Sequence, residues 1–252
     1  MAKPRWRHGF TDIPPDSAGY LALTFGRPSE RLAGATGHAL EEARHAHQMA
    51  ASTWSEIYRR HGRLLANETM TPAARLQVSA ETNRKSWAAA KKRLQAAMAD
   101  VADLGAQVHK RITTATAAPA SPGAAAIDAE VRAWLRGLDS DARLATLQSA
   151  RESGDTTILR AVSTAPAPLS GLAPEVHQAY QQTYTELVAP DDAAAAALYS
   201  EAVELLRTAS QELDWHVDQL GFDQVKAEDA EDPTAPVHPD FPHAHYPLGE
   251  VA

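Results

Sequence analysis

The chain has 252 residues and a net charge of -8, and alanine is its most prominent residue type. There are 52 alanines, or 21% of the chain, whereas Leu, Ile, Val and Phe together make 44 residues, or 17%. Because alanine favours helices and strands need β-branched and aromatic runs, the composition predicts long slender helices and excludes Rossmann folds, TIM barrels and β-sandwiches.

Residues 1–28 show no apolar periodicity and contain four prolines, so we expect an extended arm. A segment of this kind is often simply a frayed terminus. Its aromatic side chains are more apolar than a solvated tail requires, which favours an arm that docks on another surface. The expected contact residues are Trp6, Phe10, Tyr20 and Phe25.

Two long helices are predicted over residues 29–113. The first covers residues 29–66, and Thr71 and Pro72 form a strong start for the second. A heptad pattern then continues to about residue 113, and the short connection predicts an antiparallel, coiled-coil-like hairpin. The predicted hairpin core comprises Trp54, Ile57, Leu64, Trp87, Leu94, Met98, Val101, Val108 and Ile112.

The rest of the chain changes in character at residues 114–123, an Ala/Pro-rich linker. Residues 124–222 contain shorter apolar-periodic segments separated by capping residues, which predicts an acidic helical domain. Residues 223–252 are acidic and rich in Pro and His, so we expect an irregular tail. The expected fold class is therefore all-α: a long antiparallel hairpin, a second small helical bundle, an extended N-terminal arm and an irregular C-terminal tail.

The charge is divided between the two halves of the chain. Residues 1–118 carry 17 Lys or Arg against 10 Asp or Glu, whereas residues 119–252 carry 7 against 22. A basic rib on the second predicted helix could contact nucleic-acid backbone or the acidic half of another copy, although a solvated face gives the same pattern. The rib comprises Arg84, Lys85, Lys91, Lys92 and Arg93.

The sequence contains no motif that assembles a nucleophile, a base and an oxyanion site, so we expect no enzyme and no cofactor. Glu42 and His45 form a Glu-x-x-His motif, but a di-iron bundle needs two such motifs and further glutamates. Residues 141–163 could be read as a helix–turn–helix, but only Arg160 could read a base there. The candidate metal ligands are His238, His243 and His245, because His-x-His in an extended segment can hold a divalent ion.

No apolar segment follows the positive charges at the start of the chain, so we expect no signal peptide. No segment approaches the ~18 apolar residues of a membrane span. We therefore expect a protein that is cytoplasmic during synthesis and has no membrane partner.

Residues 143–172 combine an Ala/Arg helix, a Gly-Asp step, a short Leu/Ala/Val helix and an Ala-Pro…Leu-Ser-Gly-Leu turn. This segment resembles uncharacterised helical proteins of tailed phages and prophages. The resemblance implies a phage origin and a place in the virion or its assembly. The expected function is a non-enzymatic structural or assembly protein that contacts other copies and other virion proteins. The alternatives are a nucleic-acid-associated protein that uses the basic hairpin, and a helical-bundle metalloprotein.

Overall fold

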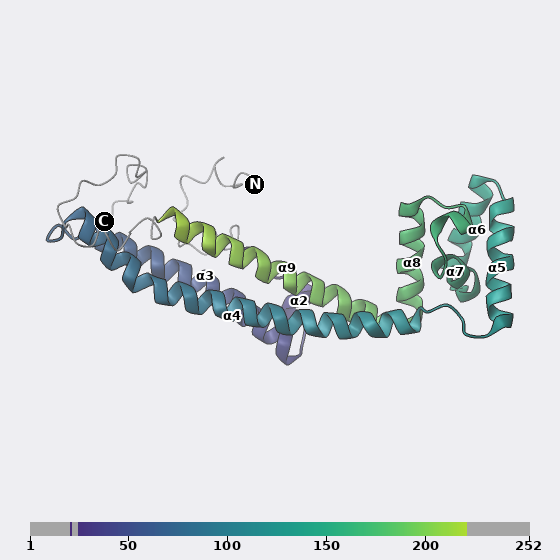
Figure 1. Ribbon diagram of the computed structural model, residues 1–252, viewed down its shortest axis with the longest axis horizontal. Coiled ribbons are helices and arrows are strands. Elements are labelled where there is room, and N and C mark those ends of the chain that lie inside the picture. The colour runs from purple at the N-terminus through teal and green to yellow at the C-terminus, as the bar shows by residue number, and fades with distance from the viewer. Residues whose placement is uncertain (1–20, 22–24, 221–252) are drawn as a thin grey trace. The chain divides into compact units, whose positions relative to one another are not determined.

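The computed structural model describes Leu21 and residues 25–220, and every regular element in this part of the chain is a helix (Figure 1). The predicted all-α class is confirmed. None of the described helices combines the length and the apolar character needed to cross a bilayer. The expectations for Trp6, Phe10 and Tyr20, and for the three histidines of the tail, fall outside the described residues.

The described residues form two compact units. Unit 1 contains those up to Val101 and those from Glu201 onwards, and unit 2 contains Ala102–Ser200. Helices α4 (Pro72–Ala115) and α9 (Pro190–Gln219) contribute to both units. Unit 1 is therefore built from two stretches of chain that lie far apart in the sequence.

This division differs from the predicted one at residues 114–123. The helix does stop there, since α4 ends at Ala115 and α5 begins at Pro122. The division between the two units, however, falls within the residues of α4 and within those of α9. The reason is that the second half of α9 packs with the hairpin, so part of the predicted acidic domain belongs to unit 1.

The first predicted helix is two helices, α2 (Glu30–Gly34) and α3 (His38–Leu65). Gly37 separates them with a φ of 122°, a backbone conformation that glycine adopts without steric cost. The guanidinium of Arg44 then donates hydrogen bonds of 2.9 and 2.7 Å to the carbonyls of Leu32 and Ala35, which satisfies the end of α2.

Helices α3 and α4 form the antiparallel hairpin that the sequence predicts (Figure 1). The Thr71 hydroxyl accepts from the Ala74 amide and caps the start of α4, as expected. Of the predicted core, Trp54, Ile57, Leu94, Val101 and Val108 are buried, whereas Leu64, Trp87, Met98 and Ile112 are half-buried. Val108 and Ile112 belong to unit 2, whereas α3 lies in unit 1.

Phe25 was expected in an arm available to partners, and the structure places it in the core of unit 1 instead. Its side chain is 0% exposed, and its ring stacks on His216 of α9 with the centroids 6.0 Å apart. The Nε2 atom of His47 donates to the Phe25 carbonyl at 3.0 Å. These contacts attach the start of the described chain to α3 and α9, so Phe25 docks within its own chain.

Unit 2 contains a small bundle of short helices. They are α5 (Pro122–Gly137), α6 (Ser140–Ser153), α7 (Thr156–Ser163), the 3-10 helix η2 (Ala167–Ser170) and α8 (Pro174–Val188). Side-chain oxygens of Ser121, Asp139 and Asp155 cap α5, α6 and α7. Two apolar clusters hold the bundle together; they comprise Leu135, Leu147 and Val162, and Ala150, Leu159 and Tyr184.

Candidate functional site

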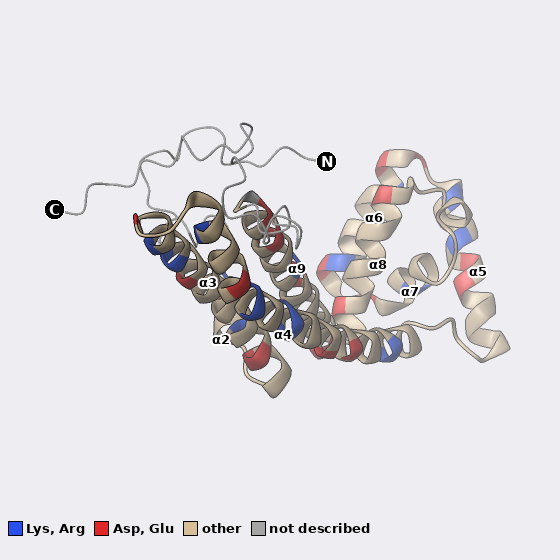
Figure 2. Ribbon diagram, turned by 60° about the vertical axis from the view of Figure 1, so that its left-hand side comes forward, with Lys and Arg blue, Asp and Glu red and all other residues tan. Residues whose placement is uncertain are grey.

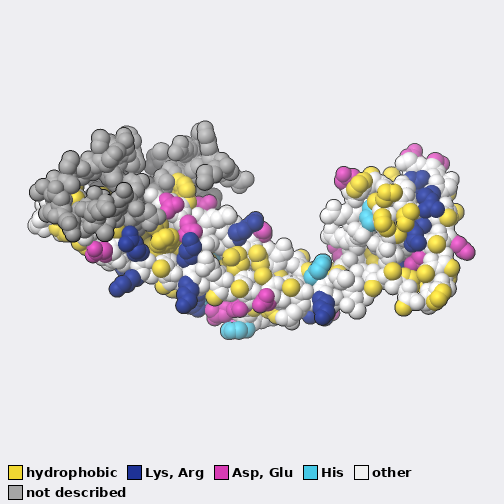
Figure 3. Space-filling model, viewed as in Figure 1, with side chains coloured by type: hydrophobic (Ala, Val, Ile, Leu, Met, Phe, Trp, Pro, Cys, Tyr) yellow, Lys and Arg dark blue, Asp and Glu magenta, His cyan; other side chains and the backbone are white. Residues whose placement is uncertain are grey.

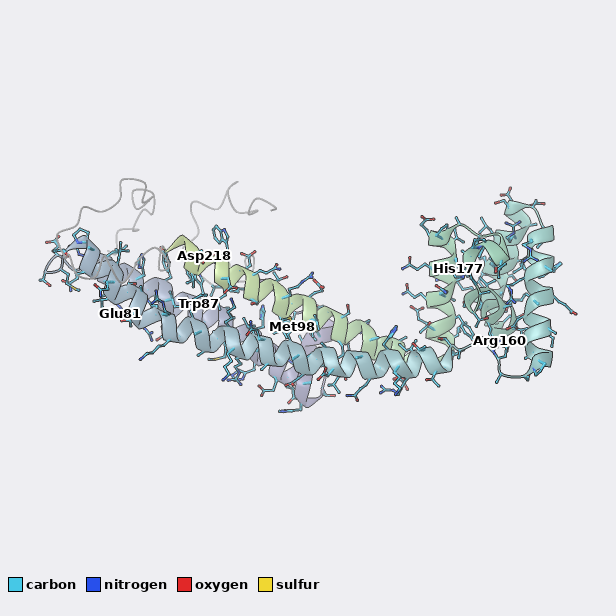
Figure 4. All side chains as sticks on the ribbon, viewed as in Figure 1. Glu81, Trp87, Met98, Arg160, His177 and Asp218 are labelled. Atoms are coloured by element: carbon cyan, nitrogen blue, oxygen red, sulfur yellow. The ribbon has the colours of Figure 1, made fainter. Side chains whose placement is uncertain are left out.

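The basic rib lies on α4, where Figure 2 shows Lys and Arg positions in blue along the ribbon. Lys91 forms an ion pair of 2.7 Å with Asp214 of α9. The indole nitrogen of Trp87 donates to the same carboxylate at 3.1 Å, and the Lys91 ammonium lies 5.5 Å from the Trp87 ring centroid (Figure 4). Lys91 therefore fixes α9 on α4.

Arg93 is also engaged within the chain. Its guanidinium forms a 3.0 Å ion pair with Glu42 of α3 and donates to Nδ1 of His45 at 2.8 Å. The hydrogen bond from Arg93 lowers the pKa of the Glu42 carboxyl below its usual range. The Glu-x-x-His motif thus forms a salt-bridged link between α3 and α4. Its carboxylate and the Nδ1 atom of His45 both contact Arg93, whereas a metal-binding role would require one of them to face an ion.

These contacts change the interpretation of the charge split. One contact between the basic hairpin and the acidic half lies inside a single chain, because Lys91 pairs with Asp214 of α9, whereas Arg93 pairs with Glu42 within the hairpin. Lys85 and Lys92 are exposed at the surface, as are Arg84 and the ion-paired Arg93. The predicted contact with an acidic partner would rest mainly on Lys85 and Lys92.

Replacing Asp214 with alanine should weaken unit 1 by about 1–2 kcal/mol, because one carboxylate joins two side chains of α4. The pair is about one-third exposed, so solvent screening keeps the effect at this modest size. The midpoint of urea unfolding followed by circular dichroism measures it.

Glu42→Ala is the matched control for that variant. It removes a pair in the same unit that is more exposed and is screened by solvent. We expect no resolvable shift of the midpoint. A larger shift for Glu42→Ala than for Asp214→Ala would contradict the importance of the α4–α9 link.

A buried aromatic cluster surrounds His216, and the sequence patterns did not predict it. The imidazole stacks on Trp54 of α3 with 4.4 Å between centroids, and Trp215 packs against it edge-on at 4.7 Å. Phe25 completes the cluster. Burial in this apolar setting lowers the pKa of His216 to about 4. The signal available in the sequence was the position of His216 in the apolar stripe of α9, next to Val217.

In unit 2 a buried ion pair connects α5 and α7. The Asp128 residue is 1% exposed, and Arg160 donates to its two carboxylate oxygens at 2.8–3.2 Å (Figure 4). This hydrogen bonding raises the pKa of the Arg160 guanidinium. Because Arg160 is held by Asp128, the helix–turn–helix interpretation loses the base-reading side chain it depended on.

Other arginines of unit 2 bind backbone carbonyls. Arg143 donates to the carbonyls of Leu135 and Leu138 at 2.8 and 2.7 Å, and also to that of Gly171. It thereby satisfies the C-terminal end of α5 and joins it to the turn after η2. His177 of α8 acts similarly, since its Nε2 atom donates to the Ala165 carbonyl at 2.8 Å. These polar side chains hold helices together.

Two large apolar side chains of α5 remain half-exposed. Ile127 and Trp134 each have 50% relative exposure, and Figure 3 shows hydrophobic side chains reaching the surface of unit 2. The two residues lie seven positions apart, so they share one side of the helix. Leu135 of the same helix is buried in the core, and Val131 and Leu138 pack against that core.

Within residues 25–220 and at Leu21, no three His, Cys, Asp or Glu side chains gather in a way that could hold a metal ion. The candidate ligands of the tail are not among these residues.

Comparison of the chain with protein-family models, with curated proteins and with solved structures finds no match.

Proposed function

We propose that this chain is a non-enzymatic structural or assembly protein that acts through helix–helix contacts with further copies of itself. Its charged and polar side chains at helix contacts hold helices together, as Lys91, Arg143 and Arg160 do. Ionisable groups that stabilise helix packing are typical of a protein that functions by assembling with other subunits.

The observation that carries this proposal is the exposed apolar stripe of α5. Isolated apolar residues on a surface are common, whereas apolar side chains that adjoin one another are typical of contact surfaces. Ile127 and Trp134 are aligned in this way, and each loses only half of its exposure within unit 2. Association that buries both side chains would supply about 2 kcal/mol or more of hydrophobic free energy from each copy.

The occupant we propose for this stripe is a second copy of the chain. The exposed side chains Lys85 and Lys92 of unit 1 are basic, whereas residues 122–189 in unit 2 carry eight Asp or Glu against five Arg. Complementary charges of this kind favour a head-to-tail contact between copies, because they steer the encounter and set its register. The phage resemblance of residues 143–172 supports a virion component as the specific setting.

Sedimentation velocity of the full chain at low and high salt tests the proposal. We expect oligomers at low salt that weaken as salt rises, and a monomer for the double variant Ile127→Ser, Trp134→Ser. The matched control is Leu187→Ser on α8, an exposed apolar residue outside the stripe, which should leave the oligomer intact. A wild-type monomer under all conditions would refute the proposal.

A gel shift with the same protein examines the nucleic-acid alternative. Binding that weakens with salt and is lost in Lys85→Glu, Lys92→Glu would assign the exposed rib to phosphate contacts. The absence of a shift at 50 mM salt would remove that alternative.

A further inference from the structure

The tip of the hairpin, residues 55–85, extends beyond the end of α9. Asp214 lies level with Trp87 and Lys91, and α9 runs antiparallel to α4. Since α9 ends at Gln219, five residues further on, its end lies near residue 84 of α4. The first twelve residues of α4, about 18 Å of helix, therefore have only α3 beside them among the described helices.

The interior of this tip contains a polar layer that is closed to solvent. Ser79 and Asn83 of α4 are both 0% exposed. Nδ1 of His61 lies 2.9 Å from the Ser79 hydroxyl, and the Asn83 amide donates to that hydroxyl at 3.2 Å. The Asn83 Oδ1 atom is buried and has no hydrogen-bond partner among the described residues.

Such a layer needs a third partner for two reasons. A pair of helices leaves the flanks of its contact stripe open to water, so complete burial of short polar side chains calls for another layer of chain. A buried carbonyl oxygen without a donor also costs about 1–3 kcal/mol, which a covering segment with amide groups could recover.

The chemistry of the tip selects between the two parts of the chain that could supply this layer. Residues 55–85 carry six Lys or Arg against three Glu, so the tip is basic. Residues 221–252 carry seven Asp or Glu against one Lys, whereas residues 1–20 carry three Lys or Arg against two Asp. Electrostatic complementarity therefore favours the C-terminal segment.

Chain continuity favours the same segment. Helix α9 ends at Gln219, level with the point where the uncovered part of α4 begins. The segment that follows α9 therefore starts next to this part of α4. Phe222 and Val225, close to this point, are apolar side chains suited to cover a buried layer. We propose that residues 221–252 bind the tip of the hairpin within the same chain and form its third layer.

Hydrogen exchange of the full chain and of a variant that lacks residues 221–252 tests this proposal. We expect the amides of residues 72–84 to exchange at least ~10-fold faster in the variant. The amides of residues 94–101, which lie opposite α9, serve as the internal control and should keep their protection. Loss of protection in both regions would show a variant that has not folded, and the charge variant below then decides.

The charge variant replaces Glu228, Asp229, Glu231 and Asp232 with lysine and keeps the full length of the chain. It should also accelerate exchange of residues 72–84, because four repelling charges face a basic tip. A matched variant, with serine at Thr234 and Ala235, should have no effect. Unchanged exchange in the charge variant would overturn the proposal.

Two further outcomes would overturn it in favour of another occupant. If removal of residues 1–20 accelerates exchange of residues 72–84, and removal of residues 221–252 does not, the layer belongs to the N-terminal arm. Protection of residues 72–84 that falls on dilution of the wild type would assign it to another copy. Protection that is independent of concentration is the result we expect.

Discussion

Replacing Arg160 with alanine should destabilise unit 2 by about 3–5 kcal/mol, the range measured when one partner of a buried ion pair is removed. The Asp128 carboxylate has 2% relative exposure and receives its hydrogen bonds from Arg160. Without that guanidinium, the carboxylate would be left buried without its counter-charge. Hydrogen exchange of the amides of α7 at neutral pH would measure the loss.

A double variant provides the control. Asp128→Ala together with Arg160→Ala removes both charges, so it should be more stable than Arg160→Ala alone. A single variant that is no less stable than the double one would show that the pair is not what joins α5 to α7. Arg132, whose guanidinium donates to the Ala161 carbonyl, stays in place in both variants and keeps a second link between these helices.

The second large effect is a loss of stability of unit 1 in mild acid. The pKa of His216 is about 4 in the folded chain, against an ordinary value of 6.5. Between these two values the unfolded chain binds a proton that the folded chain does not. The free energy of unfolding should therefore fall as pH decreases from about 6.5 to about 4, by about 3 kcal/mol in total. Below about pH 4 the residue binds a proton in both states and adds no further change.

His216→Phe isolates this contribution. Phenylalanine keeps an aromatic ring against Trp54 and Phe25 but cannot take up a proton. Urea unfolding of wild type and variant gives the free energy of unfolding of each protein from pH 7 to pH 4. The difference between these two free energies should change with pH by the predicted amount. Burial raises the pKa of Glu212. The contribution of this carboxyl to the free energy of unfolding therefore increases as pH falls, which opposes the effect of His216 equally in both proteins. Parallel pH profiles for the two proteins would contradict the prediction.

The features that the sequence predicted were those with a local cause. Thr71 and Pro72 mark the start of α4 through their own backbone preferences, and the heptad spacing identifies Leu94 and Val101 as buried. Gly37 stands at the point where the structure divides the first predicted helix into α2 and α3. In each case the determining interaction lies within a few residues.

The features that the sequence did not predict depend on contacts between distant residues. Lys91 was predicted only as part of the basic rib because its partner, Asp214, is 123 residues away. Phe25 looked like an arm residue because the ring that stacks on it belongs to α9. Composition also suggested that the acidic half of the chain would form a separate domain, since charge averages do not show which helix packs on which.

Because unit 1 joins residues before Val101 to residues after Glu201, its completion depends on the order in which the chain is made. Lys91 leaves the ribosome 123 residues before Asp214, which corresponds to about 6–25 s at typical rates of synthesis. During that interval α3 and α4 can pair, while the surface for α9 stays uncovered. The helices of unit 2, whose partners lie close in sequence, can form during the same interval. The last helix to emerge therefore completes the first unit to begin.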